Sequence, residues 1–250
     1  MAPHGPEATL PSLAVLHVWC DGDPRGAAAN MALDEALLDW SMGSGQAAIR
    51  LYTWDHTAIT TGYFPDRGTG DPRTAPPSGG TGRVRRFTGG GLVEHGEDVT
   101  FALAVPATAA RDASLPASSA ERYRWIHGAL AGALTGAGMS LETVAAGHAG
   151  RTGPCFTHPV PWDLVDPATG RKIAGGAQRR SRGAFLHQGS VRLPEGMRSP
   201  DAPWVASFLA GLALSTMSLG EEIRKGLLAA GEDLVVSRYG DPAWNEPTTG

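Results

Sequence analysis

The stretch from 162 to 193 constrains the fold most, because β-forming runs alternate there with strong turn signals. We predict three strands joined by a turn and a basic hairpin tip, in the order strand 162–165, turn 166–170, strand 172–178, tip 179–183 and strand 184–193. Consecutive strands with such short connections pair antiparallel. The sequence therefore predicts an antiparallel meander inside a larger α/β arrangement.

The remaining elements are predicted from hydrophobic periodicity and from residues that begin or end helices. Asn30 is the predicted N-cap of a helix that ends before Gly43 and Gly45, and Ser118 with Glu121 forms a capping box for a second helix over 118–134. The other predicted elements are a first strand at 13–19, a hairpin of 49–54 with 58–62, strands at 83–87 and 100–105, a long loop at 66–82 and a helical C-terminal third over 203–230.

Length and charge limit the classes of protein that fit. The 250 residues suit a loose tail at 1–12 followed by one domain over 13–250. A formal net charge of −4 argues against nucleic acid or an anionic membrane as a partner. No signal peptide or membrane-spanning run is apparent, so we expect a cytoplasmic protein. The two cysteines, Cys20 and Cys155, are too few for a disulfide framework and have no zinc-site spacing, so no metal site is expected.

Lysine usage singles out one residue. Of 21 basic residues only Lys172 and Lys225 are lysines. Lys225 lies four residues after Glu221, the spacing of a solvated helical ion pair. Lys172 lies among glycines, where no helix face accounts for it. A lysine kept against such a preference for arginine indicates a role for a compact ammonium group.

The segment from Arg85 to His95 is the second candidate for a site. Three consecutive glycines, Gly89, Gly90 and Gly91, let backbone N–H groups turn toward one anion or carbonyl oxygen. Arg85 and Arg86 can supply positive charge before the loop, and His95 closes it. The spacing is not that of a Walker loop or a dinucleotide fingerprint. The structural alternative is a hairpin with solvated arginines and a surface histidine.

Cys155 is the third candidate. It stands in a loop near His158, where a neighbouring cation or imidazole could lower its pKa and make it a nucleophile. The alternative is a small buried thiol. The run Gly175, Gly176 and Ala177 permits close approach of a ligand, and an extended alkyl tail along a strand suits it.

These segments resemble a known family. The run RRFTGGGLVEH at 85–95 resembles the RRxxGGGxVxH signature of the lipoate protein ligase A family, in the biotin and lipoate protein ligase superfamily, and GRKIAGGAQR at 170–179 resembles its GxKxxGxAxxR signature. The run NMALDEA at 30–36 is similar to the family's first helix. The resemblance implies an α/β fold with a mixed, largely antiparallel sheet flanked by helices, and it places Lys172 against an acyl carbonyl.

The resemblance also implies an acyl-transfer activity in protein lipoylation, and leaves two chemistries open. In octanoyltransferases, which segment 155–165 resembles, a cysteine corresponding to Cys155 accepts octanoate from acyl carrier protein, and no cofactor is used. In lipoate ligases, which the complete glycine run resembles, lipoate is activated with ATP and Mg. In both, the acceptor is a lysine of a lipoyl domain or of a glycine cleavage H-type protein. We favour octanoyl transfer; a non-catalytic acyl or nucleotide binding module is the alternative from another class.

Overall fold

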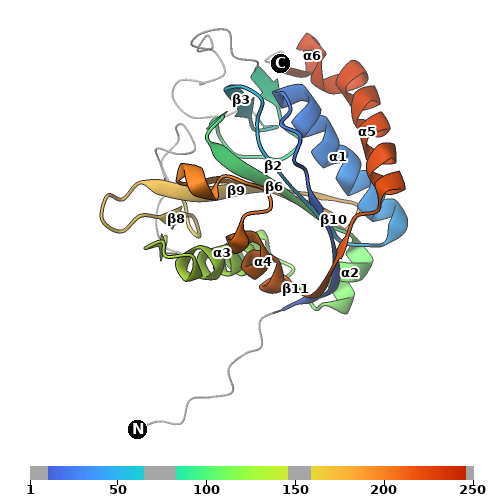
Figure 1. Cartoon of the computed structure of the whole chain (residues 1–250). Helices are drawn as coiled ribbons and strands as arrows, with labels where there is room; N and C mark the ends of the chain where they lie inside the picture. Colours follow the sequence, from blue (N-terminus) through green and yellow to red (C-terminus); the bar gives the residue numbers. More distant parts are fainter. Residues whose placement is uncertain (1–10, 65–82, 146–158, 246–250) are drawn as a thin grey trace.

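The computed structural model describes residues 11–64, 83–145 and 159–245, in which a large sheet lies between two layers of helices (Figure 1). Eight strands form this sheet in the order β11-β1-β2-β6-β10-β9-β8-β7. Their bounds are β1 Leu13–Cys20, β2 Ala48–Tyr52, β6 Asp98–Val105, β7 Glu142–Thr143, β8 Leu164–Val165, β9 Lys172–Ser181, β10 Ala184–Arg192 and β11 Ala213–Ser218. Only β1 pairs in parallel, with β2 and β11, so the sheet is mixed and largely antiparallel, as predicted.

A second sheet of three strands carries the glycine-rich segment. It consists of β3 Ala58–Thr61 between β4 Arg83–Arg85 and β5 Val93–His95. Strand β4 pairs with β3 in parallel and β5 pairs with it antiparallel. The loop between β4 and β5 therefore holds the three glycines at one end of this small sheet.

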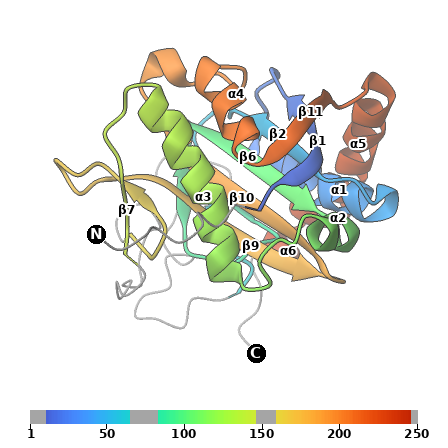
Figure 2. The same cartoon turned by 90° about the horizontal axis from the view of Figure 1, so that it is seen from below.

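The helices cover both faces of the large sheet. Helices α1 Ala27–Ser44 and α5 Glu221–Leu234 lie on one face, and α3 Ser119–Gly136 and α4 Pro203–Ala210 lie on the other (Figures 1 and 2). The remaining helical segments are α2 Ala107–Asp112, the 3₁₀ turn η2 Glu195–Met197, the π-helical turn η3 Val235–Tyr239 and α6 Pro242–Asn245. No helix in these described ranges is long and apolar enough to cross a membrane.

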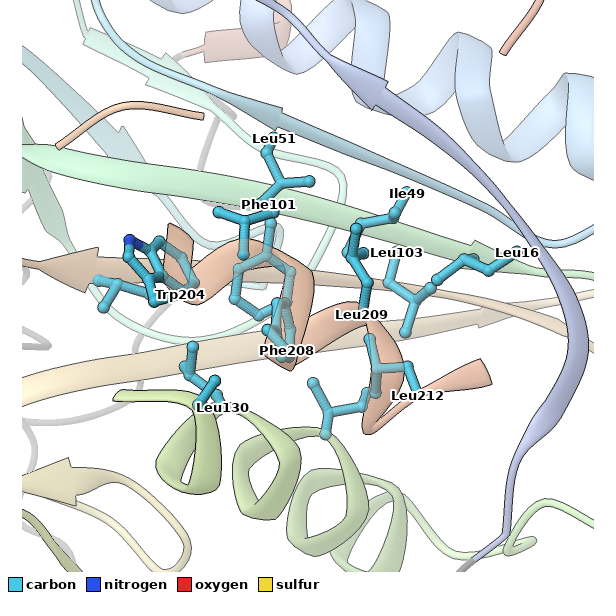
Figure 3. Close-up of a cluster of buried hydrophobic side chains, with 14 of the residues drawn as sticks. Leu16, Ile49, Leu51, Phe101, Leu103, Leu130, Trp204, Phe208, Leu209 and Leu212 are labelled. Carbon is cyan, nitrogen blue, oxygen red and sulfur yellow. The ribbon is translucent and has the colours of Figure 1, made fainter. Parts of the chain in front are cut away.

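The larger core lies between the sheet and the α3/α4 layer. Phe208 of α4 meets Phe101 of β6 edge to face, with ring centroids 5.1 Å apart, and Leu130 of α3 closes the cluster (Figure 3). Each such fully buried side chain stabilises the fold by about 2 kcal/mol. This core fixes β6, β10 and β9, the strands that carry the candidate site.

Most predicted elements near the site are confirmed. The β8–β9–β10 meander pairs antiparallel, as predicted, but the tip is shorter than the predicted 179–183: β9 continues to Ser181, and the tight turn consists of Arg182 and Gly183, both with positive φ. Ser118 caps α3 at the predicted position, since its Oγ accepts the backbone N–H of Glu121 at 3.1 Å, and the predicted pairing with the Glu121 side chain is made through that same Oγ, which donates to the carboxylate at 2.8 Å. The division into a tail and one domain remains a prediction, and the loop at 66–82 lies outside the described residues.

Three local predictions are wrong. Helix α1 begins at Ala27, and Asn30 lies inside it with its side-chain oxygen accepting a 2.7 Å bond from buried Arg50, a tertiary contact that periodicity does not encode. Strand β3 does not pair with β2 but joins the small sheet. The helical stretch at 203–230 contains strand β11, whose one buried residue, Ala213, gives no alternating pattern.

Candidate active site

A cavity lies where strands β9 and β10 meet the small sheet. Its empty volume is about 410 Å³, which includes space open to solvent. The lining residues come from α1, both sheets and the two signature segments, and they are Met31, Thr60, Arg86, Val93, His95, Thr100, Lys172, Gly175, Gly176, Ala177, Gln188, Gly189 and Ser190. The two segments singled out from the sequence therefore form the walls of one cavity.

The side chain of Lys172 is buried and paired. It is 1% exposed, and its Nζ lies 2.8 Å from Oδ2 of Asp163, which is fully buried. Burial raises the pKa of Asp163, and the ammonium of Lys172 opposes that shift. A lysine held in this way presents positive charge at a fixed position in the cavity wall.

Gly175 provides the space that this pair occupies. A Cβ atom at position 175 would lie 2.3 Å from Cε and 2.4 Å from Nζ of Lys172, and 2.8 Å from Oδ1 of Asp163. These distances are shorter than any real contact of a Cβ atom. Only glycine therefore lets the ammonium lie against the strand backbone.

The position of Asp163 depends on a strained residue before it. Trp162 has φ of 73°, an unfavourable region for a bulky side chain. Its backbone is held on both sides, because its N–H donates to the Val144 carbonyl at 3.0 Å and its carbonyl accepts from His127 Nδ1 at 2.7 Å. Burial lowers the pKa of His127 to about 4; the bond to Trp162 opposes this shift, and the charge of Lys172 adds to it. His127 is therefore a neutral donor that anchors the turn leading to Asp163.

The glycine-rich loop is organised by Arg86. Arg86 as a whole is 4% exposed. Its guanidinium donates to the carbonyls of Gly89 at 2.6 Å and Gly91 at 2.9 Å and to Oγ1 of Thr60 at 3.2 Å. The loop also packs directly on backbone, since a Cβ atom at Gly62 would lie 1.8 Å from the Gly90 carbonyl oxygen. Arg86 thus ties two loop carbonyls to β3 and fixes the loop shape.

Arg85 belongs to a different contact. Its guanidinium lies over the rings of Trp244, at 4.2 Å from the centroid, and Tyr63, at 4.9 Å. Its backbone is held from the C-terminal segment, because Trp244 Nε1 donates to the Arg85 carbonyl at 2.7 Å and the side chain of Asn245 accepts its N–H at 2.9 Å. We call Trp244 and Asn245 the C-terminal clamp, since they fix β4 immediately before the glycine loop.

His95, which lines the cavity, forms a buried polar pair with Asp98. His95 Nδ1 donates to Asp98 Oδ2 at 2.8 Å, and its ring stacks on Trp54 with centroids 3.9 Å apart. Thr100 and Ser190 also donate to Oδ2 of Asp98. Burial alone would raise the pKa of Asp98, but the charge and hydrogen bond of His95, with the other donors, outweigh it and lower the pKa to about 2. The imidazole is therefore held in a fixed orientation.

The structure brings together most of the residues predicted from the sequence. Arg86, His95, Lys172 and the run 175–177 line the cavity, and the glycine loop adjoins it, because a Cβ atom at Gly90 would lie 3.7 Å from Ala177 Cβ. Arg85 is directed to the C-terminal clamp instead. Cys155 and His158 lie outside the described residues.

Several residues of the site were not predicted. Asp163 follows a non-helical, non-strand stretch at 159–162 and gives no periodic signal; its sequence cue is a lone carboxylate just before a short strand. Gln188 joins α1 to the glycine loop, since it donates to Asp34 at 2.6 Å and accepts from Thr88 at 2.6 Å.

The described residues contain no group of three or more His, Cys, Asp or Glu side chains arranged to hold a metal ion.

The fold is that of the lipoate protein ligases. A lipoate-protein ligase A bound with ATP superposes with a TM-score of 0.64 at 16% identity, covering 94% of this chain and 98% of the other. A second match, from a structural analysis of a bipartite lipoate protein ligase and its E2 lipoyl domain from Thermoplasma acidophilum, gives a TM-score of 0.59 at 17% identity and covers 94% of this chain and 96% of the other.

Sequence similarity defines the family. The model of the lipoyl protein ligase A/B catalytic domain matches residues 26–194, and the chain belongs to this family. Curated relatives include the octanoyltransferases LipM of Kyrpidia tusciae, 34% identical over 178 residues and 68% of this chain, and of Geobacillus kaustophilus, 37% identical over 175 residues and 66% of this chain. The chain spans 63% and 61% of the length of these two relatives.

Proposed function

We propose that this protein is an octanoyltransferase of protein lipoylation, which moves an octanoyl group from acyl carrier protein to a lysine of a lipoyl domain. The buried Lys172 ammonium in the wall of the cavity, held by Asp163, carries the proposal. The similarity to LipM octanoyltransferases supports the choice of acyl group.

The proposed reaction has two acyl transfers. The Cys155 thiol gives up its proton and the thiolate attacks the thioester carbonyl of the octanoyl carrier protein; a new thioester forms at Cys155, the bond to the carrier's sulfur breaks, and that sulfur takes up the proton Cys155 lost. The ε-amine of the acceptor lysine then attacks this thioester. An amide forms, and Cys155 regains its thiol by taking the proton that the amine loses.

Lys172 is proposed as the catalytic group that stabilises charge. Both transfers place negative charge on the carbonyl oxygen, and an ammonium at a fixed position in a buried wall stabilises that charge without reorganising. A well-placed donor of this kind contributes about 3 kcal/mol, or roughly a hundredfold in rate. The residues proposed to lie along the acyl group are the two glycine-containing runs, Gly89, Gly90 and Gly91 and then Gly175, Gly176 and Ala177. His95 is proposed to shape the pocket.

Partners, cofactor and location belong to the same proposal. The lipoyl domain as acceptor is supported by the archaeal lipoylation system in which a bipartite ligase is described together with its E2 lipoyl domain, and an H-type protein is proposed as the other acceptor. The thioester route needs no cofactor. A cytoplasmic location is proposed as well, since the acyl carrier protein and acceptor would be found there.

An ATP-dependent lipoate ligase is the second candidate. The complete glycine run from Gly89 to Gly91, which resembles the ligases, favours it. In that enzyme ATP and Mg would activate lipoate, and Cys155 would be a packed thiol. The two candidates differ in their donor and in their need for Cys155.

The test follows octanoyl transfer by mass spectrometry. Purified protein incubated with octanoyl carrier protein should gain an octanoyl adduct on Cys155 that hydroxylamine removes, and it should then modify a lipoyl domain. Cys155→Ala should lose both reactions while Cys20→Ala keeps them. Transfer by Cys155→Ala with lipoate, ATP and Mg would favour the ligase instead. No transfer from either donor would leave a non-catalytic binding module.

Lysine variants test the shared part of the site. Lys172→Ala should reduce transfer about a hundredfold or more with either donor, because both reactions develop charge at the same carbonyl. Lys225→Ala is the matched control, since Lys225 is 60% exposed on α5 and pairs with Glu221 and Glu222. An active Lys172→Ala variant would contradict the assignment of the cavity.

A further inference from the structure

One wall of the Lys172 cavity is a stretch of strand β9 with little side-chain packing of its own. The run Gly175, Gly176 and Ala177 lines the cavity. Strand β8 pairs with β9 only as far as Ala174, so among the described residues no strand lies on the outer side of this run. Glycine has the widest conformational freedom of all residues. Two glycines at such an edge therefore keep one shape only if other groups hold them.

A tyrosine from helix α3 holds this run. The Tyr123 hydroxyl donates to the Gly176 carbonyl at 2.5 Å. The rings of His127 and His187 meet the Tyr123 ring edge to face, with centroids 5.2 Å and 5.0 Å away. The two imidazoles therefore fix the direction in which the hydroxyl points.

His187 supports the same peptide from behind. A Cβ atom at position 176 would lie 2.5 Å from His187 Nε2, so only glycine fits between the ring and the cavity. The Gln178 side-chain oxygen accepts from Arg122 Nε at 3.1 Å, and its amide nitrogen lies 3.0 Å from His187 Nδ1. Because a guanidinium can only donate, the Gln178 amide donates to Nδ1. Burial lowers the pKa of His187 well below its ordinary value, so the ring is neutral and its orientation is set.

The start of α3 is itself fixed. Ser118 caps the helix, and Arg122 Nη1 donates to the carbonyls of Pro116 at 3.0 Å and Ala117 at 2.6 Å. The next turns of the helix lie in the larger core. Tyr123 therefore reaches β9 from a helix that is anchored at its end and along its length.

We infer that Tyr123 is a positioning residue of the acyl site: its hydroxyl fixes the Gly176 peptide and so keeps the shape of the wall beside Lys172. This inference rests on the proposed function. Tyr123 is not among the residues that line the cavity, so it acts through the backbone. The Lys172 ammonium lies against Gly175, the neighbour of the peptide that Tyr123 holds. A wall that loosens there lets the ammonium and the acyl carbonyl lose their alignment.

The Tyr123→Phe variant tests this role, because it keeps the ring and removes only the hydroxyl. The kcat for octanoyl transfer should fall about tenfold, while the KM for octanoyl carrier protein stays within about threefold. In hydrogen–deuterium exchange, the amides of residues 175–178 should exchange faster than in the wild type. Tyr239→Phe is the matched control, since it removes a hydroxyl that donates to Glu35 at 2.6 Å away from the cavity. That variant should leave kcat and the exchange of 175–178 unchanged.

Each outcome of this experiment decides the inference. Faster exchange at 175–178 together with the loss of kcat supports it. An unchanged kcat in Tyr123→Phe overturns it, as does a loss of kcat without faster exchange in this run. A fall in thermal stability alone, like that of Tyr239→Phe, shows a purely structural hydroxyl and overturns it as well. A wild-type protein that transfers no acyl group would refute the proposed function, whereas the exchange measurement still decides whether Tyr123 fixes the run.

Discussion

Replacing Gly175 by alanine tests whether the position of the Lys172 ammonium matters. The added Cβ atom would lie 2.3 Å from Lys172 Cε, whereas an ordinary contact begins at 3.4 Å, so the side chain must retreat by about 1.1 Å. Asp163 Oδ1, at 2.8 Å, must also move. A displacement of about 1 Å in a catalytic group lowers a rate roughly a hundredfold. Overpacking of this kind destabilises the fold by about 1 to 3 kcal/mol.

The assay measures octanoyl transfer to a lipoyl domain together with thermal unfolding. Gly226→Ala is the matched control, because Gly226 lies in α5 with nothing within 4 Å of an added Cβ atom. That change should leave transfer unaltered and stabilise the helix by about 1 kcal/mol. A folded Gly175→Ala variant that transfers octanoate within threefold of the wild-type rate would refute the role assigned to the Lys172 position.

Three further predictions concern the surrounding polar residues. The folded pKa of His127 is about 4, against 6.5 for an unperturbed histidine, so the unfolded chain binds a proton first as pH falls. The free energy of unfolding should therefore drop by about 3 kcal/mol between pH 6.5 and 4. The His127→Phe variant should flatten this part of the pH profile of denaturant unfolding. Asp98 contributes stability that is complete above its unfolded pKa of 3.8 and is lost as pH falls toward its folded pKa of about 2. The Asp98→Asn variant should therefore lower the free energy of unfolding at pH 7 by about 2 kcal/mol. An unchanged free energy of unfolding would contradict the assigned pairing with His95. Trp244→Ala removes a contact of the C-terminal clamp and should raise the KM for the acyl donor more than it lowers kcat. Trp244→Phe keeps a ring beneath the Arg85 guanidinium and loses only the bond to the Arg85 carbonyl. It should have a smaller effect in the same steady-state measurements.

The sequence predicted those parts of the fold whose signals are local. The meander is specified by turn residues at 166–170 and 182–183, and α3 by the Ser118 capping box, so neither depends on distant contacts. Strand β11 was missed because its neighbours are helical and only Ala213 is buried. Its strand state comes from pairing with β1, about two hundred positions earlier, a contact that no local pattern carries.

The same distinction applies to the site. Lys172, the glycine loop and His95 were found because unusual residue types stand in recognisable order. Asp163 and His127 act through single tertiary hydrogen bonds, and a lone aspartate or histidine in a sequence has many other uses. The C-terminal clamp lies beyond the matched range 26–194, so the family's sequence pattern does not include the residues that hold Arg85 here.

The two lysines have a consequence for self-modification. An enzyme that attaches acyl groups to lysine amines risks labelling its own surface. This chain offers little to label, because it has only two lysines: Lys172 is buried against Asp163, and hydrogen bonds to Glu222 and Glu221 raise the pKa of Lys225. The other 19 basic residues are arginines, whose guanidinium stays protonated and is a poor nucleophile. Under the proposed function, the preference for arginine leaves few lysine amines of this chain to compete with the acceptor.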